Sequence, residues 1–114
     1  MRCVNCEKLI AISLPAIRAA LVARLSSVGM RQDEIAERLG VTQALVSKYL
    51  HRRYSSRVRA LSAAIAGSDK LGSIAKRVEA GTTASDANAM IDEMATSAPV
   101  ADAAARLFGK SVLE

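Results

Sequence analysis

Apolar residues recur every three or four positions along most of this chain, and no segment alternates apolar and polar residues over a convincing length. Leu14, Ile17, Leu21 and Leu25 form one such series. Because an α-helix has about 3.6 residues per turn, residues at this spacing lie on one face. The pattern therefore predicts an all-α protein with about six or seven helices.

Glycines, prolines and capping side chains set the expected helix boundaries. Pro15 is placed in the first turn of a helix, where proline is tolerated. Gly29, Gly40, Gly67 and Gly81 each follow a run at helical spacing. The predicted helices cover about residues 15–27, 32–39, 43–52, 57–66, 69–79, 83–96 and 99–108. Ser68 can cap the fifth of them, and either Thr83 or Ser85 can start the sixth.

Residues 32–51 have the pattern of two short helices joined by a tight turn. Ile35, Ala36 and Leu39 share one face of the first helix. Gly40 follows directly and suits the left-handed backbone conformation that ends a helix sharply. The first helix is therefore expected to bury these apolar residues and to stop at Gly40.

The second helix is expected to begin after Thr42, which is a good N-cap. Val46, Tyr49 and Leu50 recur at helical spacing and would bury one face. The opposite face carries Gln43, Ala44, Ser47, Lys48 and His51. This order of residues is typical of a helix-turn-helix whose second helix enters the DNA major groove. The alternative interpretation is an ordinary helical hairpin within a bundle.

The net charge of +5 is concentrated in the first half of the chain. Residues 1–57 hold ten Lys and Arg against four Asp and Glu (+6), whereas residues 58–114 hold six against seven (−1). The stretch from Lys48 to Arg59 contains five basic residues and no acidic one. Directly after a DNA-reading helix, such a run favours phosphate contacts over a merely solvated surface.

Each outward residue of the second helix has a chemically suited partner on DNA. Gln43 can pair bidentately with adenine, and Lys48 can donate to guanine O6 or N7. Ala44 can meet a thymine methyl group, and Ser47 permits close approach. The expected phosphate contacts come from Arg31, Arg52, Arg53 and Arg57.

Three segments are expected: an N-terminal arm (residues 1–13), a helix-turn-helix domain (14–67) and an Ala-rich C-terminal helical segment (68–114). The helix around Ile91 and Met94 is too apolar to stay solvated alone. It either completes the monomer core or forms a dimer interface, and we favour dimerisation for the C-terminal segment. We expect a homodimer, because helix-turn-helix proteins usually read two half-sites one helical turn apart.

The arm carries Cys3 and Cys6, at the spacing of a metal-binding pair. One pair supplies two thiolates, whereas a structural zinc ion takes four ligands. Two arms of a dimer can complete a four-cysteine zinc or iron–sulfur site, and a redox dithiol is a further option. Two ordinary reduced thiols are the simplest interpretation, so no metal or cofactor is expected.

Length and composition narrow the class of protein. A chain of 114 residues suits one domain with an appended arm, and 3% aromatic residues disfavour base stacking on single strands. No run of 18 or more apolar residues appears, so no membrane span and no membrane partner are expected, and the N-terminus is a poor secretory signal. The expected location is the cytoplasm. No catalytic constellation appears, so the protein is not expected to be an enzyme.

Residues Leu14–Leu21 followed by Gln32–Leu50 resemble small archaeal transcriptional regulators of the Cro/phage-repressor-like (XRE-type) helix-turn-helix class. The Cys-bearing arm is also similar, and the resemblance covers about residues 1–80. It implies a lambda-repressor-like domain with additional C-terminal helices, sequence-specific binding to double-stranded DNA, usually as a homodimer, and no enzymatic activity. This chain departs from that group in having no cysteine after Cys6.

By position, the resemblance implies base contacts for Gln43, Ala44, Ser47 and Lys48, and a backbone position for Thr42. It also implies that Gln32 touches a phosphate at the start of the first helix. Two other functions stay open: a protein-interaction module built on the same scaffold, and a non-specific architectural DNA binder.

Overall fold

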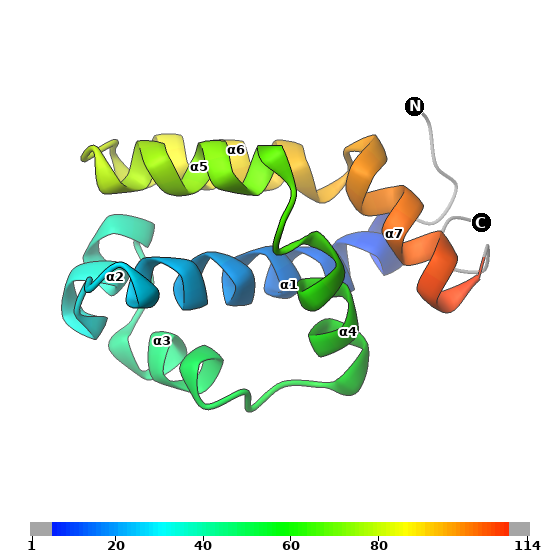
Figure 1. Ribbon diagram of the computed structural model, residues 1–114, viewed down its shortest axis with the longest axis horizontal. Helices are drawn as coiled ribbons and strands as arrows, with labels where there is room; N and C mark the ends of the chain where they lie inside the picture. The colour runs from blue at the N-terminus through cyan, green and yellow to red at the C-terminus, as the bar shows by residue number, and fades with distance from the viewer. Residues whose placement is uncertain (1–5, 110–114) are drawn as a thin grey trace.

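The computed structural model describes residues 6–109, which form seven α-helices and contain no strand (Figure 1). The predicted all-α class is therefore confirmed. The helices are α1 (Cys6–Ser27), α2 (Gln32–Leu39), α3 (Gln43–Leu50), α4 (Ser56–Ile65), α5 (Asp69–Glu79), α6 (Ala84–Ala95) and α7 (Ala98–Phe108).

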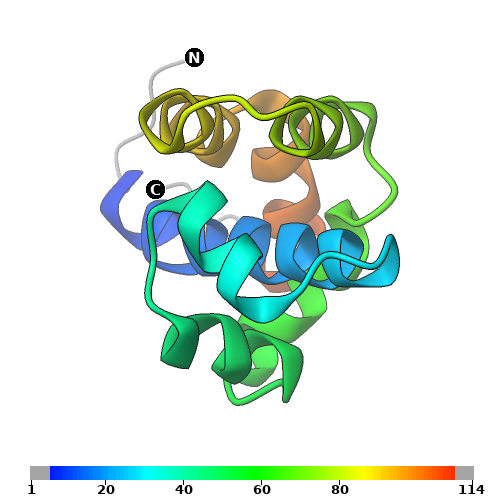
Figure 2. The same cartoon turned by 90° about the vertical axis from the view of Figure 1, so that its left-hand side faces the viewer.

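The central element is α1, which contacts each of the other six helices. The series Ile17, Leu21 and Leu25 is fully buried along it. In Figure 1, α1 runs through the middle, with α5 and α6 above it and α3 and α4 below. Figure 2 shows α5 and α6 side by side on one face and α3 on the other. The core therefore forms around one long apolar helix rather than between two domains.

The predicted start of this helix near Pro15 is wrong, because α1 already begins at Cys6. Leu9 and Ser13 are buried and extend the inward-facing series by two further turns. Pro15 lies inside the helix and removes one backbone donor. The carbonyl left without that donor belongs to Ala11, whose residue is exposed, so water can replace the lost bond. The expected boundary between residues 13 and 14 therefore falls inside α1.

Residues 7–27 of α1 are long and apolar enough, by length and composition alone, to cross a membrane. No membrane span was expected from the sequence, because no unbroken apolar run is long enough. This segment qualifies once two charged residues are tolerated within 18 positions. Half of this window is buried inside the protein. Its place at the centre of the helical core accounts for its apolar character.

The C-terminal helices belong to the same core. Ile91 and Met94 of α6 and Val100 of α7 are fully buried among residues of α1, α2 and α4. Of the two interpretations of α6, the structure shows the one in which it completes the monomer core. Its apolar residues therefore no longer argue for a dimer interface. Among residues 6–109, the exposed large hydrophobic side chains are Val28 and Leu107.

Candidate nucleic-acid interface

The turn between α2 and α3 depends on Gly40. This residue has the left-handed backbone expected of it, with φ of 67°. Its N–H bonds to the Glu37 carbonyl at 3.3 Å, and the Val41 N–H bonds to the Ala36 carbonyl at 3.0 Å. A Cβ at Gly40 would lie 3.1 Å from the Cβ of Ala84 in α6. Glycine is therefore needed here both for the turn and for the close approach of α6.

The start and the inner face of α3 are as predicted. The Thr42 hydroxyl accepts a hydrogen bond from the Leu45 N–H at 3.1 Å, which caps the helix. Val46 is fully buried and Tyr49 nearly so. Burial raises the pKa of the Tyr49 hydroxyl, and the nearby Arg18 guanidinium offsets part of that rise. This helix therefore has a fixed start and a fixed orientation on α1 and α2.

The outer face of α3 is open to solvent. Gln43, Ala44 and Lys48 are exposed, and none is covered by another described element. Ser47 is only half-exposed, and its Oγ lies 3.2 Å from Nδ1 of His51. The four predicted base-contacting residues therefore share one face, with Ser47 the most recessed of them.

The predicted backbone-contacting residues occupy four places, of which the start of α3 holds Thr42. Arg31 and Gln32 lie at the start of α2, and the exposed Arg31 forms an ion pair with Asp33 at 3.1 Å. Arg52 and Arg53 follow α3 and are also exposed. Arg57 lies in the first turn of α4, and its Cζ is 5.5 Å from the centre of the Phe108 ring in α7. Arg57 is thus the one predicted contact with a partner on the C-terminal helix.

Arg52 has an unusual backbone for a residue with a side chain, with φ of 55°. Its N–H bonds to the Tyr49 carbonyl at 3.2 Å, and the Arg53 N–H bonds to the Lys48 carbonyl at 3.0 Å. This bond pair is the usual ending of an α-helix, and glycine normally occupies the left-handed position. This ending was not predicted, because arginine, unlike glycine, does not indicate a left-handed position after a helix.

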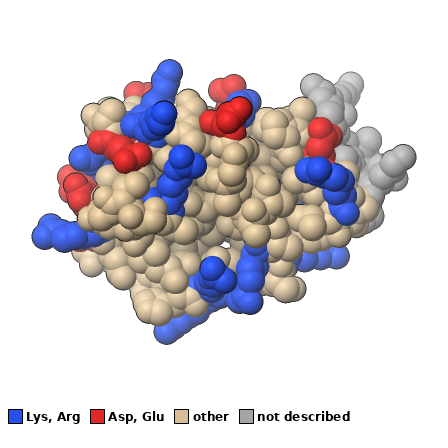
Figure 3. Space-filling model, viewed as in Figure 1, with Lys and Arg blue, Asp and Glu red and all other residues tan. Residues whose placement is uncertain are grey.

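Positive charge gathers on the side of α3. Between Glu37 and Asp69 the sequence contains six Lys and Arg and no acidic residue. In Figure 3, basic side chains line the lower edge of the protein, over α3 and the loop that follows it, while the acidic side chains lie higher. An unneutralised basic surface beside an open helix is the electrostatic feature expected of a phosphate-binding protein.

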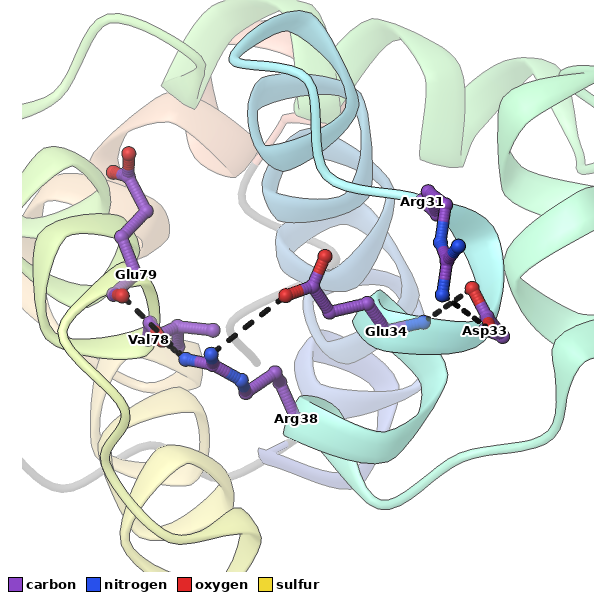
Figure 4. Close-up of polar contacts among 6 residues, drawn as sticks. All are labelled: Arg31, Asp33, Glu34, Arg38, Val78 and Glu79. Carbon is purple, nitrogen blue, oxygen red and sulfur yellow. Dashed lines mark hydrogen bonds and ion pairs between the residues drawn. The ribbon is translucent and has the colours of Figure 1, made fainter.

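The first helix of this pair, α2, is fixed by the C-terminal helices (Figure 4). Nη1 of Arg38 donates to the Val78 carbonyl at the end of α5, at 2.6 Å, and Nη2 lies 3.8 Å from Glu34. Nδ2 of Asn88 in α6 donates to the Leu39 carbonyl at the end of α2, at 2.9 Å. The Asn88 bond satisfies a carbonyl that the end of α2 leaves without a partner, whereas the Val78 carbonyl also accepts from the Gly81 N–H at 3.1 Å. Sequence reasoning did not identify these positioning residues.

The cysteine pair lies at the N-terminal limit of the residues that the structure describes. Cys3 is outside the described residues, and Cys6 is the first residue of α1. Within the part of the chain that the structure describes, no group of three or more His, Cys, Asp or Glu residues is placed to hold a metal ion. Comparison with protein-family models, with curated proteins and with solved structures gives no match to this chain.

Proposed function

We propose that this protein is a sequence-specific regulator of transcription that binds double-stranded DNA, with α3 in the major groove. The observation that carries the proposal is the outer face of α3. It is polar, exposed and basic, on a helix whose start, end and inner face are all fixed. A rigid helix with a free polar face is what base recognition requires.

The roles follow the chemistry of the side chains. Gln43, Ala44, Ser47 and Lys48 read base edges, and Arg52 and Arg53 bind the phosphates that flank the groove. Arg31, Gln32 and Thr42 meet the backbone on the other side of the turn. The Ser47 hydroxyl lies against His51, so Ser47 contributes to recognition by positioning His51 as well as by approaching the bases.

A homodimer is part of this proposal, because one eight-residue recognition helix offers few base contacts. The likeness of Leu14–Leu21 and Gln32–Leu50 to archaeal Cro-like regulators supports a lambda-repressor-like DNA-binding protein. A cytoplasmic location and the lack of a cofactor stay predictions. The dimer contact itself does not use Ile91 or Met94, since both lie inside the monomer.

Selection of bound duplexes from a random pool tests the proposal. We expect an enriched site, and Gln43→Ala should lose about 1–3 kcal/mol at one base pair and relax the preference there. Arg53→Ala should weaken binding to every sequence alike and make the dependence on salt shallower. Lys76→Ala, an exposed charge on α5, is the matched control and should change neither.

The selection also distinguishes the other functions. A pool that binds with a steep salt dependence but shows no enriched site indicates a non-specific architectural protein. No binding at low salt indicates a protein-interaction module. Equal losses for Gln43→Ala on cognate and random duplex would contradict the role given to Gln43.

A further inference from the structure

A cavity of about 680 Å³ lies between α1, the end of α3 and α4. Its floor is apolar and consists of small residues, including Ala19, Ala20 and Ala23 of α1 and Ala63 of α4. Tyr54, which is half-buried, forms part of the wall. This volume is within the range of cavities that hold small organic ligands.

Three arginines surround this apolar floor, one from each element that forms the cavity. Arg24 comes from α1, Arg52 from the turn after α3, and Arg59 from α4. None of the residues that line the cavity is acidic. None of the three arginines belongs to either ion pair found within residues 6–109. The cavity therefore combines an apolar floor with three arginines that belong to neither described ion pair, and Arg24 also lines a neighbouring hollow that contains Asp69.

The backbone of Arg52 is an independent sign that its side chain is used. A side chain in the left-handed conformation costs free energy that glycine would not, so such residues concentrate at functional sites. Nη2 of Arg59 donates to the carbonyl of Arg52 at 3.2 Å and holds the two arginines beside each other. Ser62, which is 8% exposed, also lines the cavity, and its hydroxyl has no hydrogen bond to another described residue.

We propose that this cavity binds a small organic anion that carries at least two negative charges on an apolar body. Arginine forks bind carboxylates and phosphates with paired hydrogen bonds, and the alanine floor receives the apolar part. The Ser62 hydroxyl supplies a further hydrogen bond. This site is separate from the proposed base-reading face, but it shares Arg52 with the proposed phosphate contacts.

A DNA phosphate is a poorer match to the cavity than a small molecule. The guanidinium of Arg24 lies 3.5 Å from where a Cβ of Gly72 in α5 would be, so it points toward the α5 side of α1. Arg52 lies instead at the end of α3. A ligand must enter between the helices to meet both arginines, which a duplex backbone running outside them does not do.

Titration of the ¹⁵N-labelled protein with three probes tests this site. The probes are adenosine 5′-monophosphate, benzene-1,3-dicarboxylate and inorganic pyrophosphate, with uncharged adenosine as the negative control. We expect the two organic dianions to shift the amides of Ala20, Tyr54 and Ser62, and pyrophosphate to bind about tenfold more weakly. Whichever organic dianion binds more tightly identifies phosphate or carboxylate as the natural charge.

The matched variants are Arg24→Gln with Arg59→Gln, and Arg77→Gln with Arg106→Gln as two exposed arginines away from the cavity. The first pair should weaken probe binding by about tenfold or more, and the second should leave it unchanged. Equal losses in both pairs, or no shift with any probe, overturn the proposal. The proposal is also overturned if no probe binds and the variant with Arg24→Gln and Arg59→Gln loses as much duplex binding as Arg53→Ala. The cavity arginines would then be phosphate contacts for DNA.

Discussion

The helices α2–α4 and α5–α7 share one core but differ in the charge of their surfaces. From α3 to α4 the surface is basic without an acidic residue, and the predicted contact residues there lie mostly exposed. On α5–α7 both signs occur: Asp69 precedes Lys70 in α5 and Asp102 lies near Arg106 in α7, whereas α6 carries acidic residues and no basic one. The composition change near Gly67 therefore marks a change of surface and not a break between two independent cores.

This difference assigns separate tasks to the two regions. The C-terminal helices bury Ile91 and hold α2 in place through Arg38 and Asn88. The helices before them leave α3 with a free outer face. In this protein, the region that carries the proposed recognition surface is held in place by C-terminal helices to which no DNA contact is assigned.

The largest expected effect tests whether the two regions share a core. Ile91→Ala removes a fully buried side chain and should lower the free energy of unfolding by about 2–5 kcal/mol in one cooperative transition. Asp92→Ala, exposed on the same helix, should change it by less than about 0.5 kcal/mol. Urea unfolding followed by circular dichroism measures both. A mild loss for Ile91→Ala, with α2–α4 still folded, would show two separate cores.

The next effect tests the close approach of α6 to the turn after α2. Gly40→Ala should destabilise by about 1–3 kcal/mol, because the left-handed backbone and the Cβ of Ala84 both oppose a methyl group there. Gly67→Ala is the matched control, since nothing lies within 4 Å of its added Cβ. Thermal unfolding of the two variants compares them directly. Equal destabilisation by both would argue against a special role for Gly40.

Helices α2 and α3 were predictable because residues close together in the sequence determine where they begin and end. Gln32–Leu39 forms the expected helix, and Thr42 and Ser68 cap the expected helix starts. Of the two possible caps for α6, Thr83 is the one used. In each case, the residue type and its neighbours within one turn determine the result.

The rest depends on contacts that are distant in sequence. The start of α1 was missed because burial of Leu9 outweighs the proline inside the helix. The bonds from Arg38 and Asn88 join residues 40 and 49 positions apart. The cavity arginines come from three elements, so only their positions in the fold bring them together. No local pattern reveals such arrangements.

A smaller effect tests the support that α5 gives to α2. Arg38→Met keeps the aliphatic part of the side chain but removes the bond to the Val78 carbonyl, and should cost about 1–2 kcal/mol. Arg31→Met removes an ion pair whose arginine side chain is 79% exposed, and should cost no more than about 0.5 kcal/mol. Chemical denaturation measures both. If the Arg38 bond also positions α3, Arg38→Met should weaken duplex binding without removing any side chain from the DNA-facing surface.

The smallest effect has opposite signs for stability and for binding. Arg52→Gly relieves the left-handed backbone and should stabilise the protein by about 1 kcal/mol. The same change removes a proposed phosphate contact, so it should weaken binding to all duplexes alike and reduce the salt dependence by about one unit of slope. Thermal unfolding and salt titrations of duplex binding measure the two sides. If the variant is stabilised and still binds DNA as tightly as the original, Arg52 does not contact DNA and only its proposed role in the cavity remains. If the variant is destabilised, the Arg52 side chain contributes to the stability of the fold.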